Sequence, residues 1–290
     1  MIPMASDLFK LDPPVHDGWP RFTKEELREI SKEERYVQQR LKEIGLESKK
    51  VKEDPKTQTC DLRAWTGDDP GERFWIEVKT RFSDEALIRA LKGEKTDVPF
   101  ARALGYSNTT AGILKHAVSQ LDSLAEKEEG FEIAWILSRS PFNSELHFQQ
   151  AIATVFGTQI VTEPPGSRMK PCYFFGESAF FKHKQLDAIV VEKSDAFKLC
   201  LNPYAARLER FRKTKLFAFF NPRDVIDPHE EEKTGRGYVA DCDIDRRLEK
   251  DVLAFVGEKY GLKNPVSTAF RHRGAYAIVP LIHARLGQAR

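Results

Sequence analysis

The residues best suited to chemistry lie in the segment Phe74-Trp75-Ile76-Glu77-Val78-Lys79-Thr80. Its run of aromatic and β-branched residues after a turn rich in Gly, Asp and Pro predicts a buried strand. Because side chains alternate across a strand, Glu77 and Lys79 project from one face, together with Trp75. A buried charge is costly unless it is paired, binds a metal or takes part in catalysis. A solvated strand end is the alternative, so the other residues that meet this pair decide its meaning.

Asp61 is the first candidate partner of Glu77. Residues 59–65 predict a strand, and the turn after them predicts an antiparallel hairpin with the strand of Glu77. Asp61 stands near the start of the first strand and Glu77 near the end of the second. In an antiparallel pair these ends are neighbours, so the two carboxylates can converge. An ordinary turn residue at the start of a strand is the other reading of Asp61.

The next candidate, Glu34, lies on a predicted helix. The capping box Thr23-Lys24-Glu25-Glu26 predicts a helix that runs from there to Ile44 and ends at Gly45. Its apolar stripe has one gap, which Glu34 fills. Glu34 is therefore either a polar ligand of the site or a capped or partly solvated side chain.

A second predicted helix supplies Gln120. Residues 107–110 provide the cap, and the apolar stripe predicts a helix over about 111–127. Gln120 can face either the site or solvent, and His116, one turn away, is a weaker candidate. The polar segment between the strand and this helix, residues 81–105, is interpreted as a flap over the site or as a disordered loop.

Composition narrows the class of protein. The chain has 290 residues, 41% hydrophobic and 31% charged, which suits a soluble globular protein. Its formal net charge of +2 neither demands a nucleic-acid partner nor excludes a local basic groove. The sequence has no apolar run long enough for a transmembrane helix and no signal peptide at its start. Its four cysteines are scattered, which indicates reduced thiols and a cytoplasmic protein with no membrane partner.

The order of elements predicts an α/β fold with a central mixed β-sheet flanked by helices, with additional strands and a C-terminal helical extension. The strand–helix–strand succession over residues 131–161 implies an α/β layer. Further strands are predicted at 173–175, 186–191 and 197–201, the last two as a hairpin. Three parts are expected: an N-terminal arm (1–22), the α/β domain (23–222) and a mainly helical extension (223–290).

Two further groups of charges leave their roles open. Asp187 is either a second carboxylate site or a residue at a strand start. The basic run after residue 202 either follows a phosphate backbone or is a solvated helix face. This run consists of Arg207, Arg210, Arg212, Lys213 and Lys215.

The order of these motifs resembles the PD-(D/E)XK nuclease superfamily, whose members share the restriction-endonuclease-like fold. The resemblance covers about residues 23–120, and the strand and helix that follow fit the rest of the core. It implies Asp61 and Glu77 as metal ligands, Lys79 as the catalytic lysine, Glu34 as an additional acid and Gln120 as a polar residue of the second helix. Cys60 replaces the Pro that the family pattern places before the Asp.

The expected chemistry is phosphodiester hydrolysis with Mg²⁺ or Mn²⁺. Mg²⁺ prefers oxygen ligands and is often held by one or two carboxylates with water. Asp61 and Glu77 supply these, and the Val78 carbonyl and Glu34 are further oxygen donors. Lys79 can orient or deprotonate the attacking water and stabilise the charged phosphate.

We therefore expect an endonuclease that acts on DNA in phage defence, restriction, transposition or repair, as a homodimer or with a partner subunit. One alternative is a module on the same fold that binds nucleic acid or a partner without cleavage. Another is a structural protein in which Glu77 and Lys79 form a simple ion pair. The sequence leaves the choice between DNA and RNA open.

Overall fold

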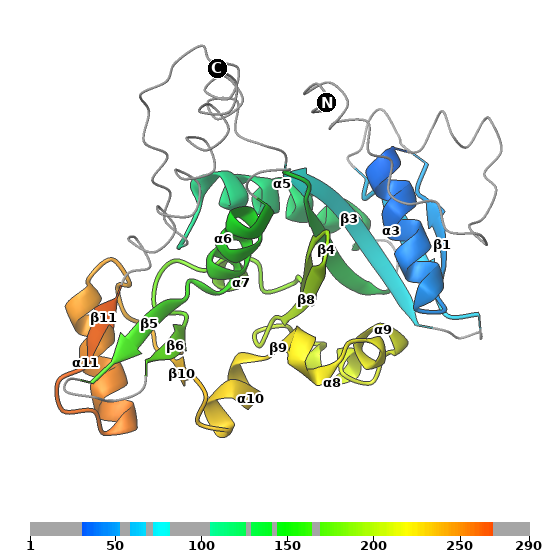
Figure 1. The fold of residues 1–290 in the computed structure, drawn as a ribbon. Coiled ribbons are helices and arrows are strands. Elements are labelled where there is room, and N and C mark those ends of the chain that lie inside the picture. The colour runs from blue at the N-terminus through cyan, green and yellow to red at the C-terminus, as the bar shows by residue number, and fades with distance from the viewer. Residues whose placement is uncertain are drawn as a thin grey trace, which may run out of the picture.

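Two β-sheets organise the chain in the computed structural model (Figure 1). The structure describes residues 31–52, 59–67, 72–81, 105–125, 129–140, 144–163 and 169–268. The predicted N-terminal arm and most of the predicted flap lie outside these residues. The larger sheet is mixed and has helices on both faces, which confirms the predicted α/β class.

The main sheet has seven strands, whose order across the sheet follows the order along the chain. The first three are antiparallel, the third, fourth and fifth are parallel, and a hairpin joins the fifth to the sixth. Both predicted hairpins are therefore confirmed. The strands are β1 (Glu47–Lys50), β2 (Leu62–Trp65), β3 (Arg73–Arg81), β4 (Phe131–Ser138), β7 (Ala188–Lys193), β8 (Ala196–Leu201) and β9 (Val225–Ile226).

Alternation along β3 divides the core into two layers. Phe74 and Ile76 pack on one face with α3 (Lys32–Glu43), α8 (Leu208–Phe211) and α9 (Lys215–Phe219). Trp75 packs on the other face, against α5 (Asn108–Ala125) and α6 (Ser144–Phe156). Residues with a two-residue period thus face two separate helical layers. Among the described residues, no helix is long and apolar enough to cross a membrane.

A second sheet corrects one prediction and adds strands to another part of the chain. It has four strands in the order β10 (Tyr238–Val239), β6 (Lys170–Tyr173), β5 (Gln159–Thr162) and β11 (Val266–Thr268). β5 was expected to continue the layer of β4 and α6, but it leaves the main sheet. The part after residue 222, expected to be mainly helical, has helices at Pro228–Lys233 and Glu249–Tyr260 among its described residues, and it also supplies β9 to the main sheet and β10 and β11 to this one.

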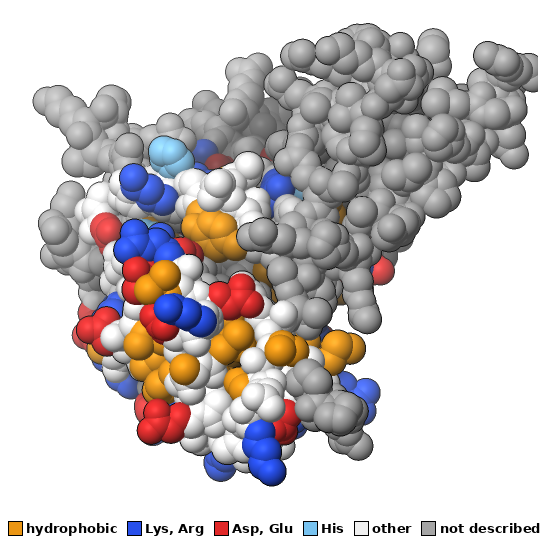
Figure 2. All heavy atoms as spheres, turned by 90° about the vertical axis from the view of Figure 1, so that its left-hand side faces the viewer, with side chains coloured by type: hydrophobic (Ala, Val, Ile, Leu, Met, Phe, Trp, Pro, Cys, Tyr) orange, Lys and Arg blue, Asp and Glu red, His pale blue; other side chains and the backbone are white. Residues whose placement is uncertain are grey.

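Helices complete this C-terminal part without separating it from the rest. α11 (Glu249–Tyr260) buries Val252 and Val256 against the second sheet. Short helices lie on the connections: α7 (Ala179–Lys182), η1 (Pro222–Asp224) and α10 (Pro228–Lys233). Acidic and basic side chains are interspersed on the face that Figure 2 shows. In this C-terminal part, Lys259 forms an ion pair with Asp241 at 2.9 Å. β9, which follows residue 222, pairs with β8, which precedes it, so the main sheet has strands from both sides of the expected boundary.

The first described helix begins later than predicted. Ser31 has an extended backbone and accepts a hydrogen bond from the amide of Glu34, so α3 starts at Lys32. The Glu34 side chain accepts in return from the Ser31 amide at 3.0 Å. This reciprocal capping box means that a single helix from Thr23 to Ile44 is wrong, because the N-cap interrupts it.

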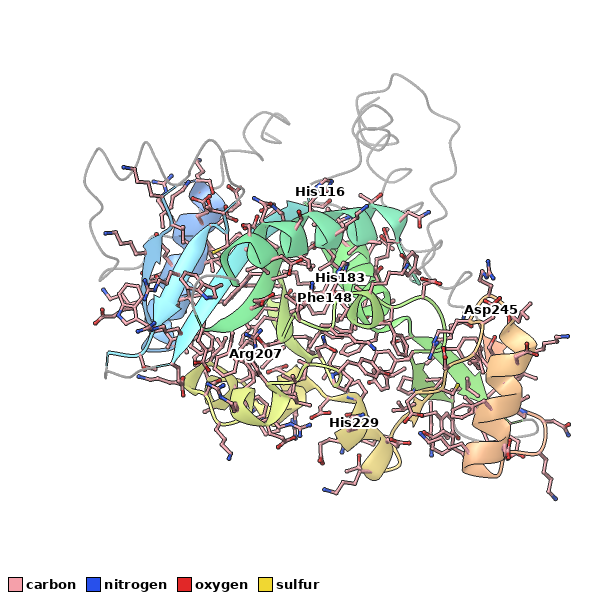
Figure 3. All side chains as sticks on the ribbon, turned by 180° about the vertical axis from the view of Figure 1, so that it is seen from behind. His116, Phe148, His183, Arg207, His229 and Asp245 are labelled. Atoms are coloured by element: carbon pink, nitrogen blue, oxygen red, sulfur yellow. The ribbon has the colours of Figure 1, made fainter. Side chains whose placement is uncertain are left out.

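A buried ion-pair cluster fastens α8 to the amino end of the parallel strands. Asp187 is fully buried and accepts from Arg207 at 2.7 Å and from the amide of Glu132 at 2.8 Å. Arg207 also donates to the Gly130 carbonyl at 2.5 Å and to Glu132 at 3.3 Å. Asp187 thus stands just before a strand, as the simpler reading of it proposed, and the Arg207 guanidinium is bound to partners within the fold. In Figure 3, Arg207 lies beneath the main sheet.

Replacing Arg207 with Met tests this cluster. The change leaves two buried carboxylates without their shared cation, so we expect a loss of roughly 3 kcal/mol in the free energy of unfolding. Urea denaturation followed by circular dichroism measures it. Arg236→Met is the matched control, since its partner Glu231 lies in an exposed pair. An equal effect of both substitutions would contradict the structural role of Arg207.

Candidate active site

The junction of β2 and β3 brings Asp61 and Glu77 together. Leu62 pairs with Ile76 in the ladder, so Asp61 lies opposite Glu77. The Asp61 amide donates to Glu77 Oε2 at 3.1 Å, and the Val78 amide donates to Asp61 Oδ2 at 2.8 Å. Each side chain therefore accepts from the opposite backbone where the regular ladder ends. The predicted convergence of the two carboxylates is confirmed.

Neighbouring segments hold Asp61 in this position. The amide of Val51, just after β1, donates to the Asp61 carbonyl at 2.9 Å. Cys60 is buried on the α5 side of the sheet, where it packs in the same apolar cluster as Trp75. Asp61 is therefore fixed by backbone bonds on one side and by an anchored neighbour on the other. The residue before Asp61 is thus a small buried thiol.

Lys79 and Gln120 complete the group. The Lys79 ammonium forms an ion pair with Glu77 Oε1 and donates to Gln120 Oε1 at 2.6 Å. Gln120 reaches this point because Ala117 and Leu121 seat α5 on the sheet. The structure thus selects the site-facing reading of Gln120. His116, the weaker candidate, is exposed on the outer side of α5 (Figure 3).

Burial and mutual repulsion dominate the electrostatics of the two acids. Glu77 is fully buried, and burial together with the nearby Asp61 charge raises its pKa to about 8, against the Lys79 contact. Burial also raises the pKa of Asp61, and the charge of Glu34 adds to this while Lys79 opposes it. Two carboxylates in so small a volume resist joint ionisation. A cation beside them would relieve that repulsion.

Glu34 lies near this group with partners of its own. Besides capping α3, it forms an ion pair with Lys50 at 3.2 Å. Lys50 was not a sequence candidate; the structure pairs it with Leu62, next to Asp61. Glu34 therefore fits the capped reading, and its charge still acts on Asp61. Its role as a metal ligand stays a prediction.

The donor chemistry fits a divalent cation held by two carboxylates. Asp61 and Glu77 offer hard oxygen atoms from adjacent strands, as Mg²⁺ and Mn²⁺ prefer. Among the described residues, no three His, Cys, Asp or Glu side chains gather into a larger ligand set. A two-carboxylate site is the usual protein contribution to Mg²⁺ binding, with water and phosphate supplying the rest. Ligation by the Val78 carbonyl stays a prediction.

Comparison with known proteins adds no relative to this description. No protein-family model matches the chain, and neither a curated protein nor a solved structure matches it. The nuclease resemblance therefore rests on the order of the motifs and on the elements that carry them.

Replacing Glu77 with Gln tests the strain between the acids. A raised folded-state pKa means that the contribution of Glu77 to stability is present below pH about 4.5 and is lost as the pH rises through about 8. At pH 8 without metal, we expect the variant to melt about 2–4 °C higher than the parent, because one of two repelling charges is gone. At pH 4.5 this difference should vanish.

Differential scanning fluorimetry with Mn²⁺ measures the second half of this prediction. The parent should gain thermal stability with added Mn²⁺, because the ion binds the folded state. The Glu77→Gln variant should not gain it, and the exposed control Glu258→Gln should behave as the parent. An undiminished Mn²⁺ shift in Glu77→Gln would exclude Glu77 as a ligand.

Proposed function

We propose that the chain is a Mg²⁺- or Mn²⁺-dependent endonuclease that hydrolyses phosphodiester bonds in DNA. The observation that carries the proposal is the reciprocal bonding of Asp61 and Glu77, with Lys79 held between Glu77 and Gln120. Hydrolysis of a phosphodiester needs hard oxygen ligands, a positive charge near the phosphate and a group that handles the proton of water. These residues offer each of them within one group.

Each residue has a separate task in this proposal. Asp61 and Glu77 hold the cation, with Glu34 and the Val78 carbonyl as further oxygen donors. When bound, the cation neutralises charge on the phosphate and lowers the pKa of its water. Lys79 Nζ orients the attacking water or stabilises the phosphate oxygens, and Gln120 fixes the direction of the ammonium.

Exposure supports this division of tasks. The Lys79 side chain is 25% exposed, whereas that of Glu77 is 0% exposed. The ammonium can therefore reach a substrate while the carboxylate stays shielded from water. Shielding strengthens the interaction of Glu77 with any cation that enters, because the local dielectric is low.

A catalytic role explains the burial of Glu77 better than a scaffold role does. Replacing buried ionic groups with apolar residues is often neutral or stabilising, so a fold alone gains little from them.

A non-catalytic binding module on the same fold is the second candidate. Cleavage of both strands would need two such sites, which we propose come from a homodimer or from a partner subunit.

Lys79→Met gives the direct test of the enzymatic proposal. Cleavage is followed on plasmid, linear and single-stranded DNA and on RNA, with Mg²⁺, with Mn²⁺ and with EDTA. We expect the parent to cut DNA only with metal, and the variant to lose activity by at least about 100-fold, since proton-transfer and positioning roles have that size.

Calorimetry with Mn²⁺ distinguishes metal binding from catalysis, because Lys79→Met keeps both carboxylates and should keep metal binding. The exposed Lys184→Met is the matched control and should cut as the parent does. Full activity of Lys79→Met would contradict the mechanism. A parent protein that binds Mn²⁺ and DNA but cuts neither strand would favour the binding module.

A further inference from the structure

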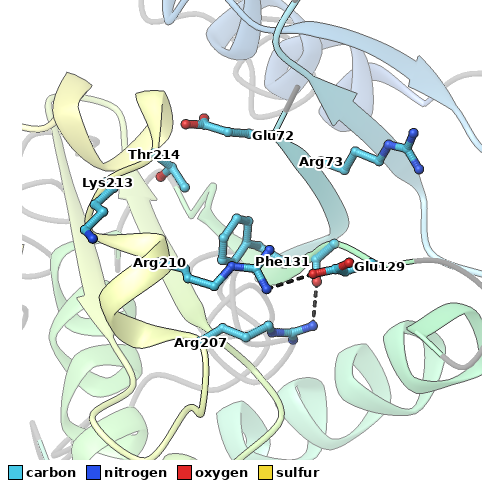
Figure 4. Close-up of a pocket in the computed structure, with 9 residues that line it drawn as sticks. Glu72, Arg73, Glu129, Phe131, Arg207, Arg210, Lys213 and Thr214 are labelled. Carbon is cyan, nitrogen blue, oxygen red and sulfur yellow. Dashed lines mark hydrogen bonds and ion pairs between the residues drawn. The ribbon is translucent and has the colours of Figure 1, made fainter. Parts of the chain in front are cut away.

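A cavity of about 530 Å³ lies at the amino-terminal ends of β3 and β4, in front of α8 (Figure 4). Arg73, at its edge, opens β3, and Lys79 stands six residues further along the same strand. At about 3.3 Å per residue, this separates the cavity from the candidate active site by roughly 20 Å. The cavity therefore needs its own explanation.

Basic side chains dominate the lining. The lining contains four cations, Arg73, Arg207, Arg210 and Lys213, and two acids, Glu72 and Glu129, which leaves a formal excess of two positive charges (4 − 2). Arg207 is committed to Asp187 and to the Gly130 carbonyl. The exposed Lys213 ammonium has no partner among the described residues.

The two acids of the lining already occupy positions suited to an anion. Glu129 forms an ion pair with Arg210 at 2.7 Å, and the Glu72 side chain accepts from the Lys215 amide at 2.8 Å. The Arg210 guanidinium lies over the buried ring of Phe131, 5.8 Å from its centroid, which helps to direct it. In Figure 4, Arg210 extends from α8 toward Glu129 across this ring. The segment around α8 is thus arranged to meet carboxylate oxygens.

An incoming anion can replace Glu129 as the partner of Arg210 at little cost in stability. Their side chains are 64% and 73% exposed, and exposed ion pairs contribute little to stability. A dianionic group would attract both Arg210 and the unpaired Lys213, whereas Glu129 offers a single charge. Guanidinium groups also match the geometry of phosphate oxygens, to which they can donate two parallel hydrogen bonds.

We propose that this cavity binds a phosphate or diphosphate group, with Arg210 and Lys213 as its ligands and Glu129 as an internal competitor that the group displaces. The volume lies in the range of small-molecule sites and admits a nucleotide-sized ligand. The group has two possible sources, a free nucleotide and the terminal phosphate of a nucleic acid. The proposal does not depend on cleavage at Lys79, because the two sites share no residue.

Inorganic pyrophosphate is the probe, titrated by isothermal calorimetry with EDTA present so that no metal links it to the carboxylates. Arg210→Ala and Lys213→Ala should each weaken binding by about tenfold, the size of one charge-assisted hydrogen bond. Glu129→Gln should tighten binding several-fold, because it removes the competitor. Lys184→Ala, an exposed lysine elsewhere on the chain, is the control.

A gain of affinity in Glu129→Gln is informative, because damage to the fold would weaken binding. The proposal is overturned if the parent does not bind pyrophosphate, if Arg210→Ala and Lys213→Ala both bind it as the parent does, or if Glu129→Gln binds it no more tightly. AMP and a 5′-phosphorylated oligonucleotide with its unphosphorylated twin then distinguish the two sources. Pyrophosphate binding by a protein that cuts no nucleic acid would leave this inference standing and remove only the nuclease proposal.

Discussion

The close approach of a fully buried carboxylate, Glu77, to a second one, Asp61, is the constraint on which the rest of the site depends. Glu77 sits inside the main sheet at the end of the ladder between β2 and β3, and Asp61 returns to it from the opposite strand. Lys79 compensates only part of the charge, and burial raises the pKa of Glu77 to about 8. The repulsion between the two acids costs the folded state free energy, and a cation bound beside them would remove that cost.

The parallel strands connect the two regions to which we assign functions. Acids gather around Asp61 and Glu77, whereas cations gather around the opening of β3 and β4. At the same ends of the strands as the cavity, Arg207 pairs with Asp187 and Glu132 and secures α8 against the sheet. The helix that borders the basic cavity is therefore held by internal charges, which leaves Arg210 and Lys213 available at the surface.

Local sequence patterns predicted the core of the site, but they did not predict the pairings between residues far apart in the chain. The two-residue period and the hairpin were enough to bring Asp61 to Glu77, and the apolar stripe of α5 placed Gln120 within reach of Lys79. The predicted start of α3 was wrong because the sequence offers two capping boxes, and the helix begins after the one that Ser31 forms with Glu34. No period or spacing links Asp187 to Arg207. The pairing of β5 with β6 and β11 likewise depends on tertiary contacts that no local pattern records.

The most direct measurement is a crystal structure of the protein soaked in Mn²⁺, with anomalous data collected to locate the ion. Our account predicts an anomalous peak between the carboxylates of Asp61 and Glu77, with the Lys79 ammonium beside it. A protein that takes up Mn²⁺ elsewhere, with Lys79 still paired to Glu77 and no peak between the two acids, would contradict the central claim.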